Sequence, residues 1–142
     1  MTFKTRRDPL FSLILLAVVI FLVYIFTIAV IEMETFEAAD IFTSTLVIVV
    51  LIFLIWSYLD TRYIITNDKL KYICGPIRGT INIEDINKIT LHKTLWVGFR
   101  PAMARKGIII HYQKFDQLYI SPSSNQSFAD YLTSLNPKII VD

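Results

Sequence analysis

The sequence predicts an α+β protein in which a hairpin of two membrane-spanning helices precedes a small antiparallel sheet closed by one helix. Three observations lead to this prediction. Two long uncharged apolar runs lie before residue 60, short runs with β-type alternation follow them, and a helical repeat comes last. The chain has 142 residues, 54% of them hydrophobic, and its mean hydropathy of +0.54 is high for a soluble domain.

The two apolar runs are long enough to cross a bilayer. Residues 10–31 contain no charge. A helix of that length extends about 33 Å, at roughly 1.5 Å per residue, and covers a hydrocarbon core of about 30 Å. Residues 41–59 are also uncharged and just reach across. Two other interpretations stay open: a signal peptide in the first run, although no Ala-x-Ala-like site follows it, and an apolar helix pair inside a soluble core.

Charge sets the predicted orientation of the hairpin. Lys4, Arg6 and Arg7 precede the first run and Arg62 follows the second, whereas residues 32–40 hold acids and no Lys or Arg. Because short loops rich in Lys and Arg stay in the cytoplasm, we expect a multi-pass cell-membrane protein with both termini cytoplasmic. The expected segments are a basic cytoplasmic N-terminus (1–9), a first span (10–31), an acidic extracytoplasmic loop (32–40), a second span (41–59) and a cytoplasmic domain (60–142).

The spans show little sign of transport chemistry. Neither holds an ionisable residue, which transporters and proton relays usually need. Thr43, Ser44 and Thr45 cluster near the outer end of the second span. They could line a polar path, but their hydroxyls can equally bond to the carbonyls of their own helix.

From residue 60 onward, short β-type runs alternate with turn residues. A two-residue turn is expected at Asn67-Asp68 and a second turn at Gly75-Pro76. About six strands result, at the runs TRYIIT, KLKYIC, RGTINI, EDINKITLHKT, GIIIHY and QLYIS.

The period then changes from strand to helix. Phe128, Leu132 and Leu135 fall on one helical face. Ser123, three residues before Gln126, fits a capping box, and the dipeptide at residues 136–137, Asn-Pro, ends the helix. We therefore expect a curled antiparallel sheet whose open end is covered by one amphipathic helix.

Several short motifs follow one another between residues 62 and 137. They are the hairpin ITNDKL, the GP turn before the third strand, INIEDI at residues 81–86, and ISP followed by a Phe-containing helix that ends at Asn-Pro. In this order they resemble the bacterial pleckstrin-homology-like (PH-like) domain family of the YyaB-like type, whose members often carry one or two transmembrane helices before the domain. The resemblance implies a PH-like sheet or partial barrel and a binding or assembly module.

The sequence contains no recognisable catalytic motif. It has no Gly-rich phosphate loop, nucleophile elbow or paired carboxylates. His92 and His111 have neither a Cys pair nor HExxH spacing, so a metal site has little support. Cys74 is the single cysteine and is expected to be a small core residue. We expect no enzyme, no cofactor, no metal and no nucleic-acid partner.

The stretch LWVGFRPAMARKGIIIHY (95–112) is the best candidate for a contact surface. It mixes apolar and basic side chains and contains no acid. Anionic headgroups attract each cation near the surface by about 1 kcal/mol, and the apolar side chains could insert among them. A protein or peptide partner, or simple packing across the chain's own sheet, are the other interpretations. The candidate residues are Lys93, Trp96, Phe99, Arg100, Met103, Arg105 and Lys106.

The leading functional hypothesis is a membrane-anchored, non-catalytic binding or scaffold module that presents a PH-like domain at the inner membrane face. Two alternatives remain. A self-protection protein could attract a cationic antimicrobial peptide through Glu32, Glu34, Glu37 and Asp40 in the acidic loop. A structural subunit of a larger membrane complex would instead use the two spans as its recognition surface.

Overall fold

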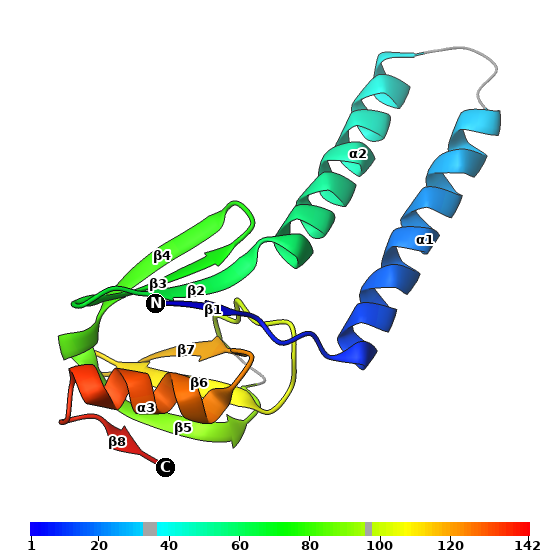
Figure 1. Ribbon diagram of the computed structural model, residues 1–142. Coiled ribbons are helices and arrows are strands. Elements are labelled where there is room, and N and C mark those ends of the chain that lie inside the picture. The colour runs from blue at the N-terminus through cyan, green and yellow to red at the C-terminus, as the bar shows by residue number, and fades with distance from the viewer. Residues whose placement is uncertain (33–36, 96–97) are drawn as a thin grey trace.

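The two apolar runs form two long helices that project from a β-domain (Figure 1). The computed structural model describes residues 1–32, 37–95 and 98–142. Helix α1 spans Pro9–Glu32 and helix α2 spans Ala38–Leu59. Their apolar windows are 0% buried, so these helices are not a core element of the domain. Helices apolar on every face are stable where lipid surrounds them, as the sequence predicts.

Within residues 1–32, 37–95 and 98–142, eight strands form two sheets of four, two strands more than the sequence predicts. The first sheet has the order β1-β2-β3-β4, and all its neighbours are antiparallel. The second has the order β7-β6-β5-β8, with β8 parallel to β5. The strands are β1 (Thr2–Lys4), β2 (Thr61–Ile65), β3 (Lys69–Cys74), β4 (Ile77–Asn82), β5 (Ile86–Lys93), β6 (Gly107–Tyr112), β7 (Asp116–Ile120) and β8 (Ile140–Val141).

The two sheets lie in separate layers. Figure 1 shows the hairpin rising from the side of the first sheet, while the second sheet and helix α3 (Asn125–Leu135) lie on the opposite side. A short 3-10 helix, η1 (Ile83–Asp85), carries the chain from one layer to the other. The layer order determines which face of the domain lies beside the base of the hairpin.

The predicted turns of the first sheet are present. Thr66 and Lys69 exchange both backbone hydrogen bonds around Asn67-Asp68, at 2.9 and 3.3 Å. Gly75 adopts a φ of +59° in the turn between β3 and β4. A Cβ there would lie 2.9 Å from the backbone of Ser57 in α2. Glycine therefore satisfies two demands, the left-handed turn and the close approach of the hairpin.

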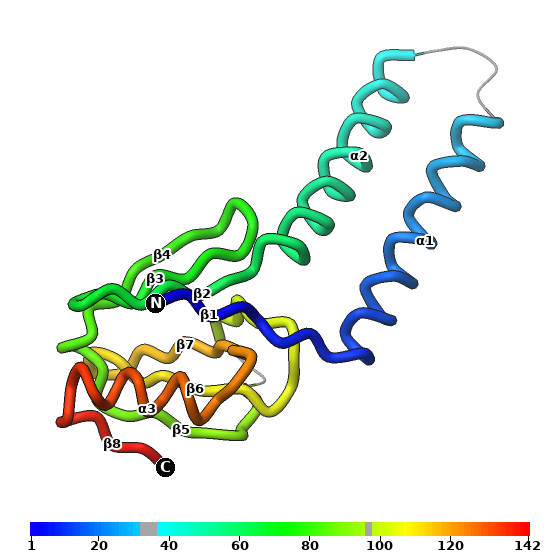
Figure 2. Tube along the Cα trace, viewed as in Figure 1, coloured from blue at the N-terminus to red at the C-terminus, as the bar shows by residue number. Residues whose placement is uncertain are grey.

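The N-terminal segment forms part of the β-domain. Thr2, Phe3 and Lys4 pair with Ile64, Tyr63 and Arg62 on β2. The helical hairpin is thus the connection between two adjacent antiparallel strands, and both chain ends lie in the domain (Figure 2). The domain boundary at residue 60 stays a prediction, and Thr2–Lys4, which the sequence places in a separate N-terminus, pair with a strand beyond it. A three-residue strand has too little pattern to be recognised before its partner strand is known.

The core lies between the sheets and under α3. It contains inward side chains of both sheets, among them Tyr63, Leu70 and Ile110, together with Phe128 and Leu132 of α3. Phe3 is 6% exposed, and its ring meets that of Phe128 edge-on at 5.0 Å. The first strand is therefore held by side-chain packing as well as by backbone pairing.

Helix α3 has the expected apolar stripe and a different cap. Ser124 is the N-cap, not Ser123, because its Oγ accepts a hydrogen bond from the Ser127 N–H at 3.3 Å. Asn136 ends the helix, as the sequence predicts, and its side-chain amide donates to the carbonyl of Ile83 at 3.0 Å. This last bond ties the end of α3 to the turn between the two sheets.

Candidate functional site

The loop after β5 closes one side of the domain. Residues 101–104 are buried. Tyr63 donates its hydroxyl proton to the carbonyl of Pro101 at 2.6 Å, and Tyr119 donates to that of Ala104 at 2.8 Å. Because each tyrosine rises from a different sheet, the loop is fastened to both layers.

Three candidate residues of this loop have roles within the fold. Phe99 is 43% exposed, and its ring meets that of Tyr72 at 5.4 Å between centroids. The guanidinium of Arg100 lies over the Tyr119 ring at 5.2 Å. Met103 is 6% exposed, so its side chain is enclosed and does not reach headgroups as the sequence-based hypothesis required. Trp96 lies outside the described residues.

The remaining candidates are exposed cations at the ends of β5 and β6. Lys93 and Lys106 are exposed, and the backbone N–H of Lys106 donates to Thr94 Oγ1 at 2.9 Å. The Arg105 Nε donates to Asp8 Oδ2 at 2.8 Å. This ion pair lowers the pKa of the Asp8 carboxyl and raises that of the Arg105 guanidinium. The loop is thereby connected to the start of α1.

The segment between β1 and α1 fastens the hairpin to the domain. Asp8 caps α1 by accepting the Leu10 N–H at 3.1 Å. Arg6 donates to the carbonyl oxygens of Arg105 and Lys106 at 2.6 and 3.0 Å. Four residues thus separate β1 from α1, and this short linker is tied down by hydrogen bonds.

Arg7 connects the bases of the two helices. It donates to the carbonyls of Tyr58 and Leu59, the last residues of α2, at 3.3 and 3.4 Å. Its guanidinium also lies 4.6 Å from the centroid of the Tyr58 ring. A cation at a helix C-terminus opposes the partial negative charge of its free carbonyls. The hydroxyls of Ser12 and Tyr58, 2.8 Å apart, join the two helices directly.

The second helix enters the sheet almost without a linker. Only Asp60 lies between α2 and β2. The Thr61 hydroxyl donates to the Ser57 carbonyl at 2.6 Å and contacts the Cys74 sulfur at 3.3 Å. Cys74 is buried, as expected for a small core residue. The domain is therefore fixed at the base of the hairpin at both connections.

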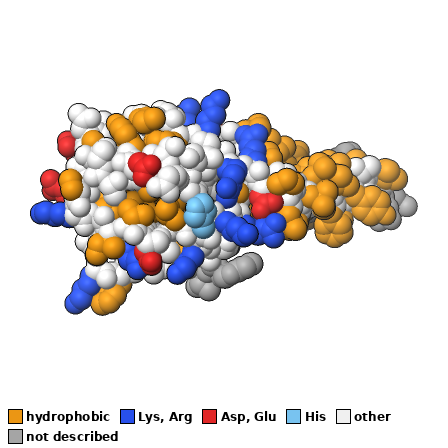
Figure 3. Space-filling model, turned by 60° about the horizontal axis from the view of Figure 1, so that its bottom comes forward, with side chains coloured by type: hydrophobic (Ala, Val, Ile, Leu, Met, Phe, Trp, Pro, Cys, Tyr) orange, Lys and Arg blue, Asp and Glu red, His pale blue; other side chains and the backbone are white. Residues whose placement is uncertain are grey.

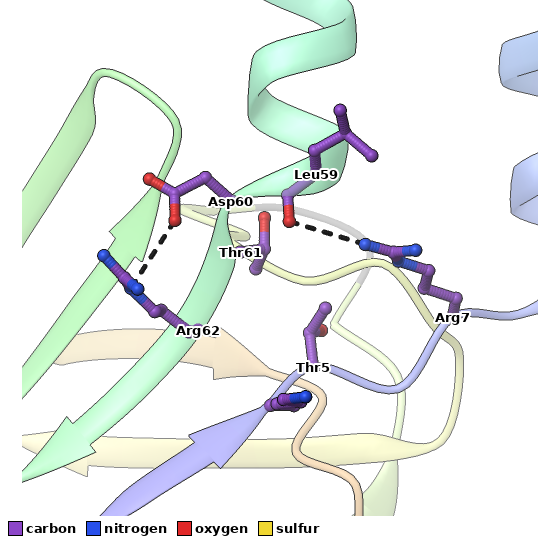
Figure 4. A pocket seen from close by; sticks show the side chains of 7 residues that line it. Thr5, Arg7, Leu59, Asp60, Thr61 and Arg62 are labelled. Carbon is purple, nitrogen blue, oxygen red and sulfur yellow. Dashed lines mark hydrogen bonds and ion pairs between the residues drawn. The ribbon is translucent and has the colours of Figure 1, made fainter.

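A hollow of about 520 Å³ opens beside this base (Figure 4). At the rim of the hollow, the Nε atom of Arg62 lies 3.5 Å from Oδ1 of Asp60. Figure 4 shows Arg7 reaching toward the end of α2 from the opposite side of the hollow. The lining residues are Lys4, Thr5, Arg7, Leu59, Asp60, Thr61 and Arg62.

The outward face of the first sheet continues this basic surface. Lys4, Arg62, Lys69, Lys71 and Arg78 are all exposed on it, at strand positions that alternate with inward-facing ones. No acid occupies an outward strand position on this sheet. Figure 3, in which the side of the second sheet comes forward, shows further Lys and Arg side chains where the hairpin meets the domain. We call the five cations the first-sheet basic face.

The acidic loop can be described in part. Glu34 lies outside the described residues. The side chain of Asp40 accepts a hydrogen bond from the Glu37 N–H at 3.0 Å and closes the start of α2. This bond gives Asp40 a role in capping the helix. Attraction of a cationic peptide to the loop stays a prediction.

The two histidines contact polar side chains of neighbouring elements. Among the residues that the structure describes, no group of three or more His, Cys, Asp and Glu could hold a metal ion. His111 Nε2 lies 3.3 Å from the hydroxyl of Thr90, and burial together with nearby Lys88 lowers the pKa of its imidazole. His92 Nδ1 lies 3.3 Å from the side-chain nitrogen of Asn125.

Comparison with known proteins identifies the domain. A family model described as "Bacterial PH domain" matches residues 61–136, more than half of the chain. The chain belongs to this family. This bacterial PH domain protein is also 30% identical to the uncharacterized protein YyaB of Bacillus subtilis, over 99% of this chain and 97% of that protein. No solved structure matches it.

The matched range leaves out the first strand of this bacterial PH domain. The whole hairpin separates residues 2–4 from the matched range in the sequence. These residues nevertheless pair with β2, the first strand of that range. The candidate surface expected from the sequence lay on the loop after β5, and the cations of β2, β3 and β4 were not among its residues. Their alternation with apolar residues was visible, but it is also typical of any solvated sheet face.

Proposed function

We propose that this chain is a membrane-anchored, non-catalytic binding module that holds its PH domain in one orientation at the cytoplasmic membrane face. One observation carries the proposal: both spans continue directly into neighbouring strands of one sheet, through Asp60 on one side and residues 5–8 on the other. A domain attached in this way has little freedom to swing. Its far side is then presented to proteins of the cytoplasm.

The proposed side of the membrane follows from charge. Lys4, Arg6, Arg7 and Arg62 stand at the domain end of the hairpin, whereas Glu37 and Asp40 stand at the other end. Basic flanks favour the cytoplasm. A Cys74→Ser chain with Asp142→Cys should react with a membrane-impermeant maleimide only after permeabilisation, and one with Ala38→Cys should react in intact cells. The reverse pattern would contradict the proposed orientation.

Exposed apolar side chains on the domain are candidate contacts for a protein partner. Phe115 is 83% exposed at the turn between β6 and β7, and Ile140 is 64% exposed on β8. Ile140 lies on a strand of the second sheet and Phe115 in the turn between two of its strands, and Figure 1 shows this sheet on the side away from α2. A cytoplasmic partner can reach this side without meeting the bilayer.

The test is photo-crosslinking in intact cells with a photoreactive residue at position 115 or 140. A binding module should give one discrete protein adduct from at least one of these positions. A photoreactive residue at position 52, an exposed site on α2, is the matched control and should give no such adduct. Adducts from position 52 alone, or none at all, would contradict the proposal.

Replacing residues 10–31 and 41–59 by unrelated uncharged helices separates a binding module from a structural subunit. The adduct should persist if the domain recognises the partner. Its loss, in a protein that still reaches the membrane, would show that the spans carry the recognition and would favour the structural subunit.

A further inference from the structure

We propose that the first-sheet basic face, with the adjoining hollow at Lys4, Arg7 and Arg62, binds the headgroups of anionic lipids in the leaflet beside it. This inference rests on the membrane anchor of the proposed function and does not require a protein partner. It names a surface different from the loop after β5.

Two cations of the first-sheet basic face form an unfavourable pair of like charges. Lys4 and Arg62 are direct partners in the register of β1 and β2, and both point outward. Like charges directly opposite on antiparallel strands repel and are destabilising. Asp60 is the one acid that lines the hollow, and it lies 3.5 Å from Arg62. An anionic group between Lys4 and Arg62 would remove the repulsion.

The outward cations form a continuous row across the first sheet. Arg62 pairs with Ile73, and Ile73 pairs with Arg78, so one row crosses the sheet from Lys4 to Arg78. Lys71 stands in the neighbouring row opposite Ile64. The cations therefore cover the width of the sheet, as contact with several headgroups requires, and extend beyond a pocket for one small anion.

The first-sheet basic face lies close to the base of the helical hairpin. The first sheet is the layer on the hairpin side in Figure 1, and the hollow begins at Leu59, where α2 ends. A lipid in the adjoining leaflet needs no diffusion to reach this face, because the hairpin holds the domain beside it. Membrane charge acts within about 10 Å at moderate salt, and residue 62 lies three positions from the end of α2.

A second hollow at the base of α1 is a weaker candidate, because none of its lining residues belongs to a strand of the first sheet. It is lined by Arg6, Arg105 and Asp8 among others. Arg105 is paired with Asp8 at 2.8 Å, and Arg6 bonds to two backbone carbonyls. In contrast, Lys4 makes no ion pair with any residue that the structure describes.

The test uses the full chain in detergent micelles, titrated with phosphatidylglycerol or phosphatidylcholine and followed by native mass spectrometry. Each near-surface cation strengthens anionic-lipid binding roughly fivefold. The double variant Lys4→Gln/Arg62→Gln should therefore lose about 25-fold in affinity for phosphatidylglycerol, with no change for phosphatidylcholine. The matched control is Lys114→Gln/Lys138→Gln, which removes the same charge from exposed sites outside the first sheet.

A second measurement reads the charge repulsion directly. In phosphatidylcholine nanodiscs, Lys4→Gln should leave the unfolding temperature unchanged or raise it, because it relieves the contact with Arg62. In nanodiscs containing phosphatidylglycerol the same substitution should lower it. A lysine with only a structural role should change the unfolding temperature in the same direction in both kinds of nanodisc.

Three results would overturn the proposal. The control variant could lose as much affinity as the first-sheet variant, which would show attraction by net charge alone. Inorganic phosphate could displace the lipid at equal concentration, which would show a site for a free anion. The unfolding temperature of Lys4→Gln could fall equally in both nanodiscs. None of these measurements contains a partner protein, so failure here leaves the photo-crosslinking test unaffected.

Discussion

The two sheets of the domain differ in whether other parts of the chain cover their outward faces. The first sheet leaves its outward face open and places five cations on it. The second sheet has a cover, since Ala102 and Leu95 of the loop after β5 pack on Ile109 and Tyr119. One of its two cations, Lys88, is paired with Asp142 at 2.9 Å, and the other, Lys93, lies at the end of β5. The contrast shows that basic residues alone do not mark a binding surface, because their partners within the fold decide what remains available.

The loop after β5 illustrates this lesson. Its mixture of aromatic and basic residues made it the leading candidate in the sequence. In the fold, Arg105 contacts Asp8, Arg100 lies on an aromatic ring and Met103 is enclosed. The cations of β2, β3 and β4 were not candidate residues in the sequence, yet they form the open surface next to the hairpin.

The largest expected effect tests whether β1 completes the first sheet. Phe3→Ala should lower the free energy of unfolding by about 3–5 kcal/mol, because it leaves a cavity against Phe128. Denaturant unfolding of the full chain in micelles measures the loss. Phe115→Ala, at an 83% exposed site, should cost little. Equal effects of the two substitutions would contradict the structural role given to β1.

A smaller effect tests the cover of the second sheet. The Tyr119 hydroxyl accepts the Gly107 N–H at 2.9 Å and donates to the Ala104 carbonyl. Tyr119→Phe should cost about 1–3 kcal/mol, since both buried backbone groups lose a partner. It should also speed proteolytic cleavage within residues 98–106. Tyr131→Phe is the control, because that hydroxyl bonds to no residue in the described part of the chain; similar cleavage rates would argue against a fastened cover.

The smallest effect concerns the ion pair that links the cover to the hairpin. Its Arg105 partner holds the pKa of the Asp8 carboxyl below its usual 3.8. The folded state therefore gains stability that is present above pH 3.8 and is lost as the pH falls through the lower folded-state pKa. Asp8→Asn should flatten the dependence of the unfolding temperature on pH below about 4. An unchanged slope would show that the ion pair adds nothing measurable.

Much of the architecture could be predicted because it depends on local patterns. The two uncharged runs indicated the helices, and the alternation of apolar residues gave six of the strands. The turns at residues 67–68 and 75–76 followed from their residue types. The family resemblance rested on these same motifs, and the match to bacterial PH domains confirms it.

The sequence by itself determined the hairpin, the fold class and the family, because hydrophobic length and periodicity are properties of neighbouring residues. Only the tertiary structure decided that Thr2–Lys4 belongs to the first sheet, since that strand is defined by its pairing with residues 62–64. The tertiary structure also decides which charged side chains are available for binding. Whether an arginine is available depends on what lies opposite it, and Asp8, far away in sequence, lies opposite Arg105.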